Sequence, residues 1–424
     1  MNEIDLTEKL KQLEAEIDRE VSIQNETRQR IWDEMTGNKP YGDAYAGGSN
    51  ASNFPASDSQ AFNSTASDSQ TSNSTAFGSQ DSDSPASAAP KITLEDINAP
   101  IITKLDFPAE EKWALTLAGG GAKGAYQLGV WKALREMQLE KNLIAVSGSS
   151  VGALNAALIS LNEFDDANTI WTSIMPKQFL DINFDTIIGP LDTLVKRTLT
   201  NGLCSRDGLI SIIDNYLNLN ELATARIPAY VCVSHYTSEC IECLNEKPEP
   251  EYISLSEVDA HDAKQLLLAS SAMPYVYPPE IIHDKVYRDG GLSDNVPVMP
   301  MTTVGADKLI VVKLEPDDKV DTSLYSKFSE VVEIVPSREI GDLLDGTLEF
   351  TNRNVDFRIL LGYYDTLRTF SLRMYRLNGL PVNEAEKKRR EDADYAKILS
   401  TLKQKRALGR ANDNIDKLKN LLSL

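Results

Sequence analysis

Residues 143–161, LIAVSGSSVGALNAALISL, place a predicted strand, a tight turn and a predicted helix in immediate succession. The apolar, partly β-branched run 143–146 is typical of a buried strand. From residue 154 onward, leucine and alanine recur at three- to four-residue spacing, which predicts a helix. Ser150 lies in the turn, and Gly148 and Gly152 relieve crowding around it. Gly-x-Ser-x-Gly between a strand and a helix is typical of a nucleophile elbow, where the helix N-terminus favours negative charge near the serine.

A glycine-rich stretch, GGGAKG at residues 119–124, follows a second strand-like run at 113–117. The residues after it have apolar side chains on one helical face, which predicts a helix. Consecutive glycines leave main-chain N–H groups free to face a ligand, as an oxyanion-binding loop requires. The stretch is therefore a candidate oxyanion loop.

Nucleotide binding is the main alternative for this stretch. Gly119, Gly121 and Gly124 match the dinucleotide pattern G-x-G-x-x-G, and Glu140 lies at a tolerable distance for a ribose-binding acid. A ribose-binding acid is expected at the end of the next strand, whereas Glu140 lies in the charged stretch before that strand. A phosphate-binding loop would need Ser or Thr after Lys123, where this chain has Gly124. A nucleotide-binding module, or a non-catalytic regulatory module, is kept as the alternative function.

A third glycine signal, Asp289-Gly290-Gly291, supplies a carboxylate. An Asp-Gly pair is by itself a common turn. Together with a serine on a tight turn and a loop of N–H donors, it completes the parts of an acyl-transfer site.

The histidines favour a carboxylate base over an imidazole base. The chain has three, His235, His261 and His283. A serine-acid-histidine order could be satisfied by Ser150, Asp262 and His283. His283 lies in a predicted hairpin between apolar and charged neighbours, which is typical of a surface or strand histidine.

These motifs, in this order, resemble the patatin-like phospholipases, lipid acyl hydrolases that work with a Ser-Asp dyad. The similarity runs from Trp113 to about Asn378 and includes ASSAMP at 269–274 and DNVP at 294–297, which flank the dyad aspartate in that family. It implies an α/β fold with three α/β/α layers around a mostly parallel sheet. Strand-like runs at 113–117, 143–147, 229–234 and 308–313, separated by helical stretches, favour the same fold class.

The resemblance also implies a role for each motif residue. Ser150 would be the nucleophile, Asp289 its base, and Gly119, Gly120 and Gly121 the oxyanion donors. The supporting motif residues are Lys123, Gly124, Gly148, Gly152, Gly290 and Gly291. The implied substrates are fatty-acyl esters of phospholipids or related glycerolipids at a membrane or micelle surface, cleaved through an acyl-serine without a cofactor or metal. Some relatives need a protein or small-molecule activator, and the sequence leaves this open.

A carboxylate base makes a physical demand on the fold. An aspartate with an ordinary pKa near 4 is a weak base. Partial burial of Asp289 would raise its pKa, so we expect burial, and a reaction rate that falls on the acid side.

The cysteines do not predict a metal site. Cys240 and Cys243 form one C-x-x-C, and Cys204 and Cys232 do not supply the second pair of a zinc ribbon. Four unclustered cysteines are typical of a reducing compartment.

The chain divides into four predicted parts. The pattern of residues 1–36 predicts a charged helix with an apolar stripe that could mediate self-association. Residues 37–94 contain a ten-residue Ser/Asn/Asp-rich repeat and predict a disordered linker. Residues 95–380 predict the catalytic domain. Within it, an apolar region from Trp171 to Ile188 is a candidate lid or acyl-pocket wall, or part of the core. Residues 381–424 predict a basic amphipathic helix, either packed on the domain or resting on a membrane.

Charge limits the partners. With 43 Lys and Arg against 63 Asp and Glu, the net charge is −20, which disfavours nucleic acid. The sequence has no apolar run of membrane length, and residues 1–5 lack a secretory signal pattern. We expect a cytoplasmic protein, with peripheral membrane association or secretion as an effector left open.

Overall fold

The computed structural model describes residues 107–174, 181–182, 204–236, 247–274, 276–341, 352–379 and 383–422. The predicted N-terminal helix at 1–36, the repeat linker at 37–94 and the Cys240/Cys243 pair lie outside the described residues. Most of the predicted lid region after Trp171 also lies outside them.

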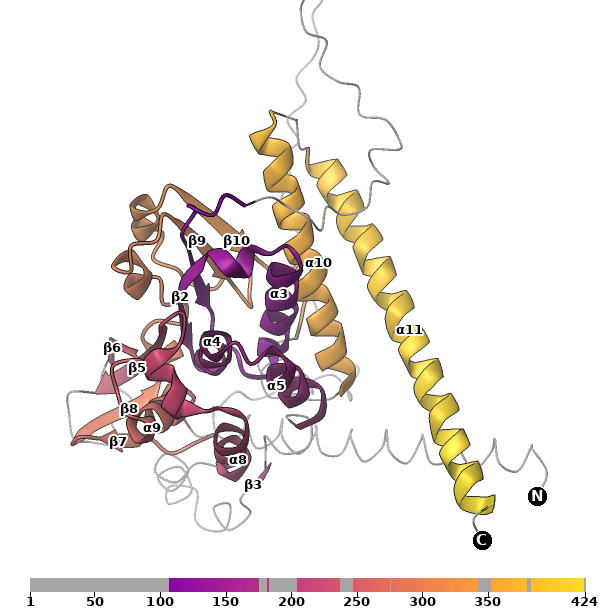
Figure 1. The fold of residues 1–424 in the computed structure, drawn as a ribbon, viewed down its shortest axis with the longest axis horizontal. Helices are drawn as coiled ribbons and strands as arrows, with labels where there is room; N and C mark the ends of the chain where they lie inside the picture. Colours follow the sequence, from indigo (N-terminus) through magenta and orange to yellow (C-terminus); the bar gives the residue numbers. More distant parts are fainter. Residues whose placement is uncertain are drawn as a thin grey trace, which may run out of the picture. The chain divides into compact units, whose positions relative to one another are not determined.

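A mixed sheet with strand order β10-β9-β1-β2-β5-β8-β7, with β6 on β5, forms the centre of the described part of the chain (Figure 1). Four of its strands coincide with the runs predicted from sequence. β10, β9, β1, β2 and β5 pair in parallel, whereas β6, β7 and β8 pair antiparallel, so the predicted mostly parallel α/β sheet is confirmed. The strands are β1 Trp113–Leu117, β2 Leu143–Ser149, β5 Ala229–Tyr236, β6 Glu249–Ser254, β7 Glu280–Ile282, β8 Lys285–Asp289, β9 Lys308–Val312 and β10 Glu330–Ile334; β3 Asp181–Ile182 and β4 Cys204–Ser205 form a separate pair.

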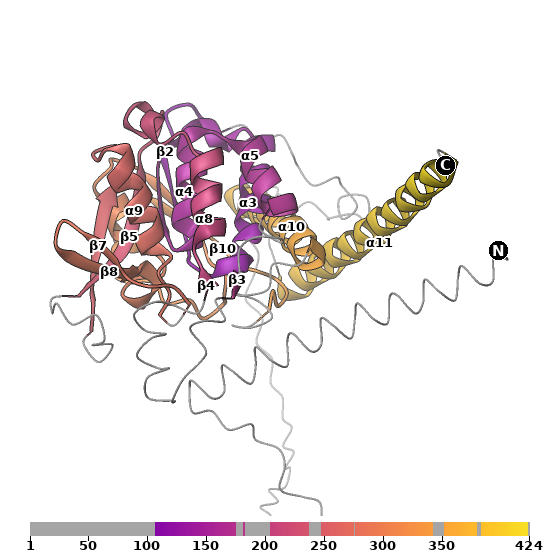
Figure 2. The same cartoon turned by 90° about the horizontal axis from the view of Figure 1, so that it is seen from below.

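Helices cover the sheet and connect its strands (Figure 2). The α-helices are α3 Ala125–Glu136, α4 Val151–Leu161, α5 Phe164–Thr169, α8 Asp207–Tyr216, α9 Ala260–Ser270, α10 Asn352–Leu377 and α11 Glu384–Leu422. Shorter helical turns are η1 Gly121–Gly124, η2 Leu139–Asn142, η3 Ile170–Ile174, η5 Leu219–Thr224, η6 Gly290–Leu292, η7 Met299–Thr302 and η8 Thr322–Lys327.

The two faces of β1 show how the layers are held. Trp113 points toward α10, where its ring meets Phe370 edge-on at 6.1 Å between centroids. Because side chains alternate along a strand, Thr116 points to the other face. There its hydroxyl lies 3.0 Å from that of Ser147, which donates to the carbonyl of Pro297, just before η7. One face of the sheet therefore contacts long α-helices, and the other contacts the segment that contains η7.

The position of the candidate site follows from one edge of β5. Along this edge β2 pairs in parallel as far as Ser149, which lies opposite Cys232. The same edge then continues with β8 in the antiparallel direction, beginning with Asp289 opposite Val233. Because Cys232 and Val233 are consecutive, the carboxyl ends of β2 and β8 meet at one point of the sheet.

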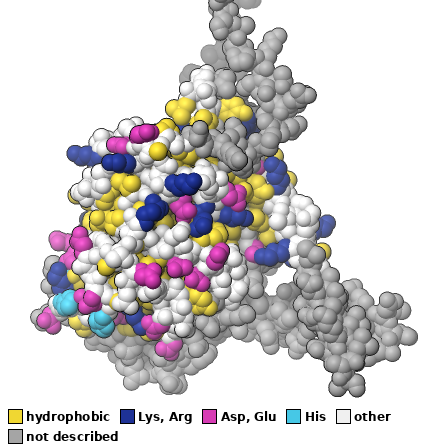
Figure 3. Space-filling view, viewed as in Figure 1, with side chains coloured by type: hydrophobic (Ala, Val, Ile, Leu, Met, Phe, Trp, Pro, Cys, Tyr) yellow, Lys and Arg dark blue, Asp and Glu magenta, His cyan; other side chains and the backbone are white. Residues whose placement is uncertain are grey.

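The helix α11 lies antiparallel beside α10 (Figures 1 and 2). Ile398 and Leu402, from the predicted apolar face of this helix, are buried in the core. A buried ion pair, 2.9 Å from Arg368 to Asp394, also joins the two helices. Of the predicted apolar face, Ile398 and Leu402 therefore pack on the domain, whereas Leu399 is exposed. On the face shown in Figure 3, acidic and basic side chains are interspersed.

Helices α3 and α10 approach each other through two glycines. A methyl group on Gly129 would collide with the main-chain carbonyl of Ile359 on α10. Conversely, a methyl group on Gly362 would collide with the carbonyl of Tyr126 on α3. Backbone atoms cannot move aside as a flexible side chain can, so the helices must separate to admit either methyl group.

This close contact predicts the sign of a stability change. In a helix interior free of such contact, Gly→Ala stabilises by up to about 1 kcal/mol. We expect Gly362→Ala to destabilise the protein by about 1–3 kcal/mol, because overpacking outweighs the gain in helix propensity. Urea unfolding measures the change, with Leu377→Ala at an exposed position of the same helix as a control that stays within about 0.5 kcal/mol. A more stable Gly362→Ala protein would contradict the packing described.

Candidate active site

Ser150 lies between β2 and α4 in a strained conformation. Its φ of 53° and ψ of −124° are rarely adopted by a residue other than glycine. The main chain packs so closely around the two flanking glycines that neither position has room for a side chain, and the turn therefore requires glycine at both. A methyl group on Gly152 would lie 2.5 Å from the carbonyl oxygen of Leu117, and one on Gly148 would collide with the carbonyl of Gly152. The strand, turn and helix thus have the geometry of a nucleophile elbow.

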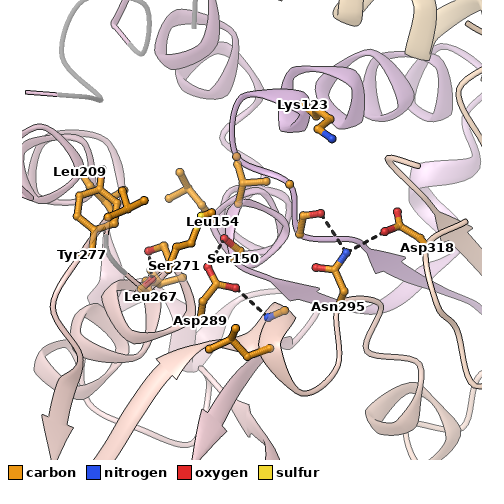
Figure 4. Close-up of a pocket in the computed structure, with 18 of the residues that line it drawn as sticks. Lys123, Ser150, Leu154, Leu209, Leu267, Ser271, Tyr277, Asp289, Asn295 and Asp318 are labelled. Carbon is orange, nitrogen blue, oxygen red and sulfur yellow. Dashed lines mark hydrogen bonds between the residues drawn. The ribbon is translucent and has the colours of Figure 1, made fainter. Parts of the chain in front are cut away.

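The structure brings Ser150 and Asp289 together although they are 139 residues apart in sequence. The Ser150 hydroxyl donates to Oδ2 of Asp289 at 2.8 Å (Figure 4). The other carboxylate oxygen, Oδ1, accepts the N–H of Gly291 at 2.8 Å. Both carboxylate oxygens therefore have a donor, and one donor is the candidate nucleophile.

The electrostatic surroundings of Asp289 make it a stronger base than an ordinary aspartate. Its side chain is buried, and the loss of water around the charged form raises the pKa of Asp289 to about 6. The N–H of Gly291, the hydroxyl of Ser150 and the charge of Arg206 oppose this rise by stabilising the carboxylate. The group remains mostly ionised at neutral pH while binding a proton more readily than in water.

The glycine loop lies beside Ser150 at the start of η1. A methyl group on Gly119 would lie 3.1 Å from Cβ of Ser150. Gly121 has a positive φ of 53°, a conformation that favours glycine. Among the described residues, none accepts a main-chain hydrogen bond from the N–H of Gly120 or Gly121, and both residues line the pocket in front of Ser150.

The expectation for Gly119 requires a correction. Its N–H donates to the main-chain carbonyl of Asn295 at 3.1 Å, so it does not face the pocket as a free donor. Of the three glycines expected to supply oxyanion donors, Gly120 and Gly121 keep this possibility in the structure.

Asn295 and Asp318 support the glycine loop and were not identified as site residues from sequence. The Asn295 side-chain amide donates to the carbonyl of Gly119 at 3.2 Å and to Oδ1 of Asp318 at 3.0 Å (Figure 4). The second oxygen of Asp318 accepts the N–H groups of Leu314 and Glu315 at 2.8 and 2.9 Å. Asn295 lies in the DNVP stretch noted in the sequence, whereas nothing local marks Asp318.

The supporting motif residues lie around the elbow and the loop. Lys123 is buried and forms an ion pair with Glu315. A methyl group on Gly124 would lie 2.6 Å from the side chain of Val151 and 2.9 Å from the ring of Trp171. On the other side, one on Gly290 would collide with the carbonyl of Cys232.

A cavity of about 330 Å³ opens in front of Ser150 and has two chemically different ends (Figure 4). Apolar side chains line the end toward α8 and α9. Charged and amide side chains line the end beyond the glycine loop. The apolar lining includes Leu154, Leu209, Ile213, Leu267, Met273, Val276 and Tyr277, and the polar lining includes Lys123, Asn295, Glu315 and Asp318.

Other candidate residues from the sequence lie outside this cavity. Trp171 is fully buried and donates to Asn155 at 3.0 Å, so it belongs to the core. His283 does bond Asp262 at 2.7 Å, but its side chain is 76% exposed and it does not line the cavity. Glu140, the acid required for dinucleotide binding, accepts the indole N–H of Trp131 at 2.7 Å.

The described residues contain no group of three or more His, Cys, Asp or Glu residues arranged to hold a metal ion. None of their helices combines the length and apolar character needed to cross a membrane.

Comparisons with known proteins agree with the resemblance seen in the sequence. The family model described as "Patatin-like phospholipase" matches residues 115–302, which include the glycine loop, the elbow and Asp289. An uncharacterized NTE family protein of Mycobacterium tuberculosis is 24% identical over 216 residues, 51% of this chain and 52% of the relative. A triacylglycerol lipase of Arabidopsis thaliana is 29% identical over 226 residues, 47% of this chain and 27% of the relative. The chain thus spans about half the length of the first relative, and less of the second.

Among solved structures, VipD from Legionella pneumophila aligns with 72% of this chain and 77% of its own, at a TM-score of 0.35 and 15% identity. The family match covers β2, β5, β6, β7 and β8 and most of β1, whereas β9 and β10 lie beyond it. Residues 115–302 of the chain thus match the patatin-like phospholipase domain.

Proposed function

We propose that this protein is a lipid acyl hydrolase in which Ser150 is the nucleophile and Asp289 its general base. The observation that carries the proposal is the 2.8 Å hydrogen bond from the Ser150 hydroxyl to Asp289, at the edge of a cavity with an apolar end. A nucleophile within hydrogen-bond reach of a base is the arrangement that activates a serine.

The proposed reaction begins when Asp289 accepts the Ser150 proton as Oγ attacks the ester carbonyl. The N–H groups of Gly120 and Gly121 stabilise the oxyanion, assisted by the N-terminus of α4. Collapse of the intermediate releases the alcohol, which takes the proton back from Asp289, and leaves an acyl-serine. A water molecule, deprotonated by the same carboxylate, then attacks the acyl-serine. The fatty acid leaves as the acyl–oxygen bond to Ser150 breaks, and Oγ of Ser150 takes the proton back from Asp289, which regenerates the enzyme.

The two ends of the cavity suggest how the ester lies. The apolar end matches the chemistry of a fatty-acyl chain, and the polar end matches that of a glycerol or phosphate-bearing alcohol. We infer that the acyl chain lies against α8 and α9 and that the leaving alcohol lies beside Lys123 and Asp318. Phospholipids and related glycerolipids have this polarity.

The catalytic unit that we propose extends over residues 95–380, beyond the family match. The buried Arg358 on α10 donates to the carbonyl of Ala122 in the glycine loop at 3.3 Å. Residues from α10 therefore support the catalytic loop directly. In this proposal residues 1–36, 37–94 and 381–424 are accessory segments, and an activator remains compatible with the site.

Removal of either member of the dyad is the first test. Ser150→Ala and Asp289→Asn are each expected to lower fatty-acid release from mixed phospholipid and glyceride micelles at least about a thousandfold, because each removes a reacting group. His283→Ala is the control, since a Ser-Asp-His triad would need this residue and the proposed dyad does not. Loss of activity in His283→Ala, or full activity in Asp289→Asn, would refute the dyad.

The pKa of Asp289 predicts the acid side of the pH profile. The base must be ionised, so log(kcat/KM) should fall with a slope of one as the pH drops below about 6. The measurement is hydrolysis of a soluble ester between pH 4.5 and 8, with thermal unfolding at each pH to show that the protein stays folded. A fall in kcat/KM with an apparent pKa near 4 would mean that burial does not raise the pKa of Asp289.

The apolar end of the cavity predicts chain-length selectivity. Leu209 is 3% exposed and lines this end, so Leu209→Trp should fill part of it. We expect kcat/KM for palmitoyl esters to fall about tenfold relative to butanoyl esters, measured on a p-nitrophenyl ester series. Leu399→Trp, at an exposed position on α11, is the matched control. An unchanged chain-length profile in Leu209→Trp would place the acyl chain elsewhere.

A further inference from the structure

The end of helix α9 contacts the main chains of both proposed reacting residues. The hydroxyl of Ser270, the last residue of this helix, accepts the N–H of Ser150 at 2.8 Å. Two residues later, the carbonyl of Ala272 accepts the N–H of Asp289 at 3.2 Å. Ser270 and Ala272 thus hold the main chains of the proposed nucleophile and base.

The sheet register shows why Ser150 needs this contact. Val146 on β2 donates to the carbonyl of Pro228 at 3.1 Å. Bonds in a parallel ladder recur every two residues on both strands, so a continued ladder would join the N–H of Ser150 to the carbonyl of Cys232. That bond would hold Ser150 in extended conformation, whereas its observed φ is 53°.

The Ser270 hydroxyl occupies the place of this missing bond. It accepts the N–H of Ser150 and donates to the carbonyl of Cys232 at 2.7 Å. Ser270 is fully buried, so water does not replace either contact without rearrangement. Both main-chain groups at the end of the ladder are satisfied while the backbone of Ser150 turns away from β5. A buried N–H or carbonyl left without a partner would be strongly unfavourable.

We infer that Ser270 is a positioning residue for the proposed reaction, and this inference rests on the proposed function. Its hydroxyl lies between the N–H of Ser150 and the carbonyl of Cys232, in place of a direct bond between β2 and β5. Ser150 can therefore adopt the strained turn that directs Oγ toward Asp289. Through Ala272 the same segment fixes the main chain of Asp289. The separation of nucleophile and base is therefore set by residues 270–272, which themselves take no part in bond making.

The inference predicts a loss of reaction rate without a loss of substrate binding. Ser270→Ala should lower kcat for ester hydrolysis between about tenfold and a hundredfold, with KM within about twofold, since the misplaced group is the nucleophile and not the pocket wall. The rate at which a fluorophosphonate labels Ser150 should fall by a similar factor. Ser270→Thr keeps a hydroxyl and should recover most of both rates.

Ser160→Ala is the matched control, because Ser160 is also buried and its hydroxyl also bonds a main-chain carbonyl, that of Ile227 at 2.6 Å. It should lose stability but neither activity nor labelling. If Ser270→Ala does not fold, as judged by circular dichroism, Ser270→Cys replaces it, because a thiol is a weaker acceptor in the same place.

The outcomes separate the two proposals. Wild-type labelling at Ser150 with an equal rate in Ser270→Ala would overturn the inference alone, as would a loss of rate in Ser270→Ala that Thr does not restore. Absence of labelling in the wild type would overturn the proposed function and, with it, the inference.

Discussion

The change of strand direction along one edge of β5 is the constraint on which the site depends. A parallel strand ends there and an antiparallel strand ends beside it, opposite consecutive residues. Neither strand alone specifies a site. Because β2 and β8 both pair with β5, the ends of these two strands bring Ser150 and Asp289 within hydrogen-bond distance. The glycine loop and the end of α9 pack around this junction. The chemistry thus depends on hydrogen-bond register, which is a property of the sheet as a whole.

In the proposed dyad, this junction also accounts for an aspartate in the role that an imidazole has in a Ser-His-Asp triad. The carboxylate is enclosed where two strands converge, and enclosure removes the water that would otherwise stabilise its charge. Donors from the following turn and from the serine limit the effect, so the group is neither an ordinary surface aspartate nor a permanently neutral acid. Burial and hydrogen bonding oppose each other, and their balance sets the basicity.

Features encoded in short stretches were predictable from the sequence, and features that depend on distant residues were not. The strands at 113–117 and 143–147 and the turn around Ser150 were predicted because apolar pattern and glycine spacing are local. The expected role of Gly119 was wrong because its N–H is taken by Asn295, 176 residues away. The support from Asp318 and the bridging hydroxyl of Ser270 likewise arise only when the sheet forms.

Enclosure of Asp289 affects more than the reaction. A carboxylate whose pKa is about 6 in the folded protein and near 3.8 in the unfolded chain binds its proton more tightly when folded. Folding stability from this group is therefore fully present below pH 3.8 and is lost as the pH rises through 6, by about 3 kcal/mol. The rise in pH that leaves the folded carboxylate ionised, and therefore able to accept a proton, also completes this loss of folding stability. Ionisation of this one buried carboxylate thus lowers the folding stability of the protein while it makes the carboxylate available as a base.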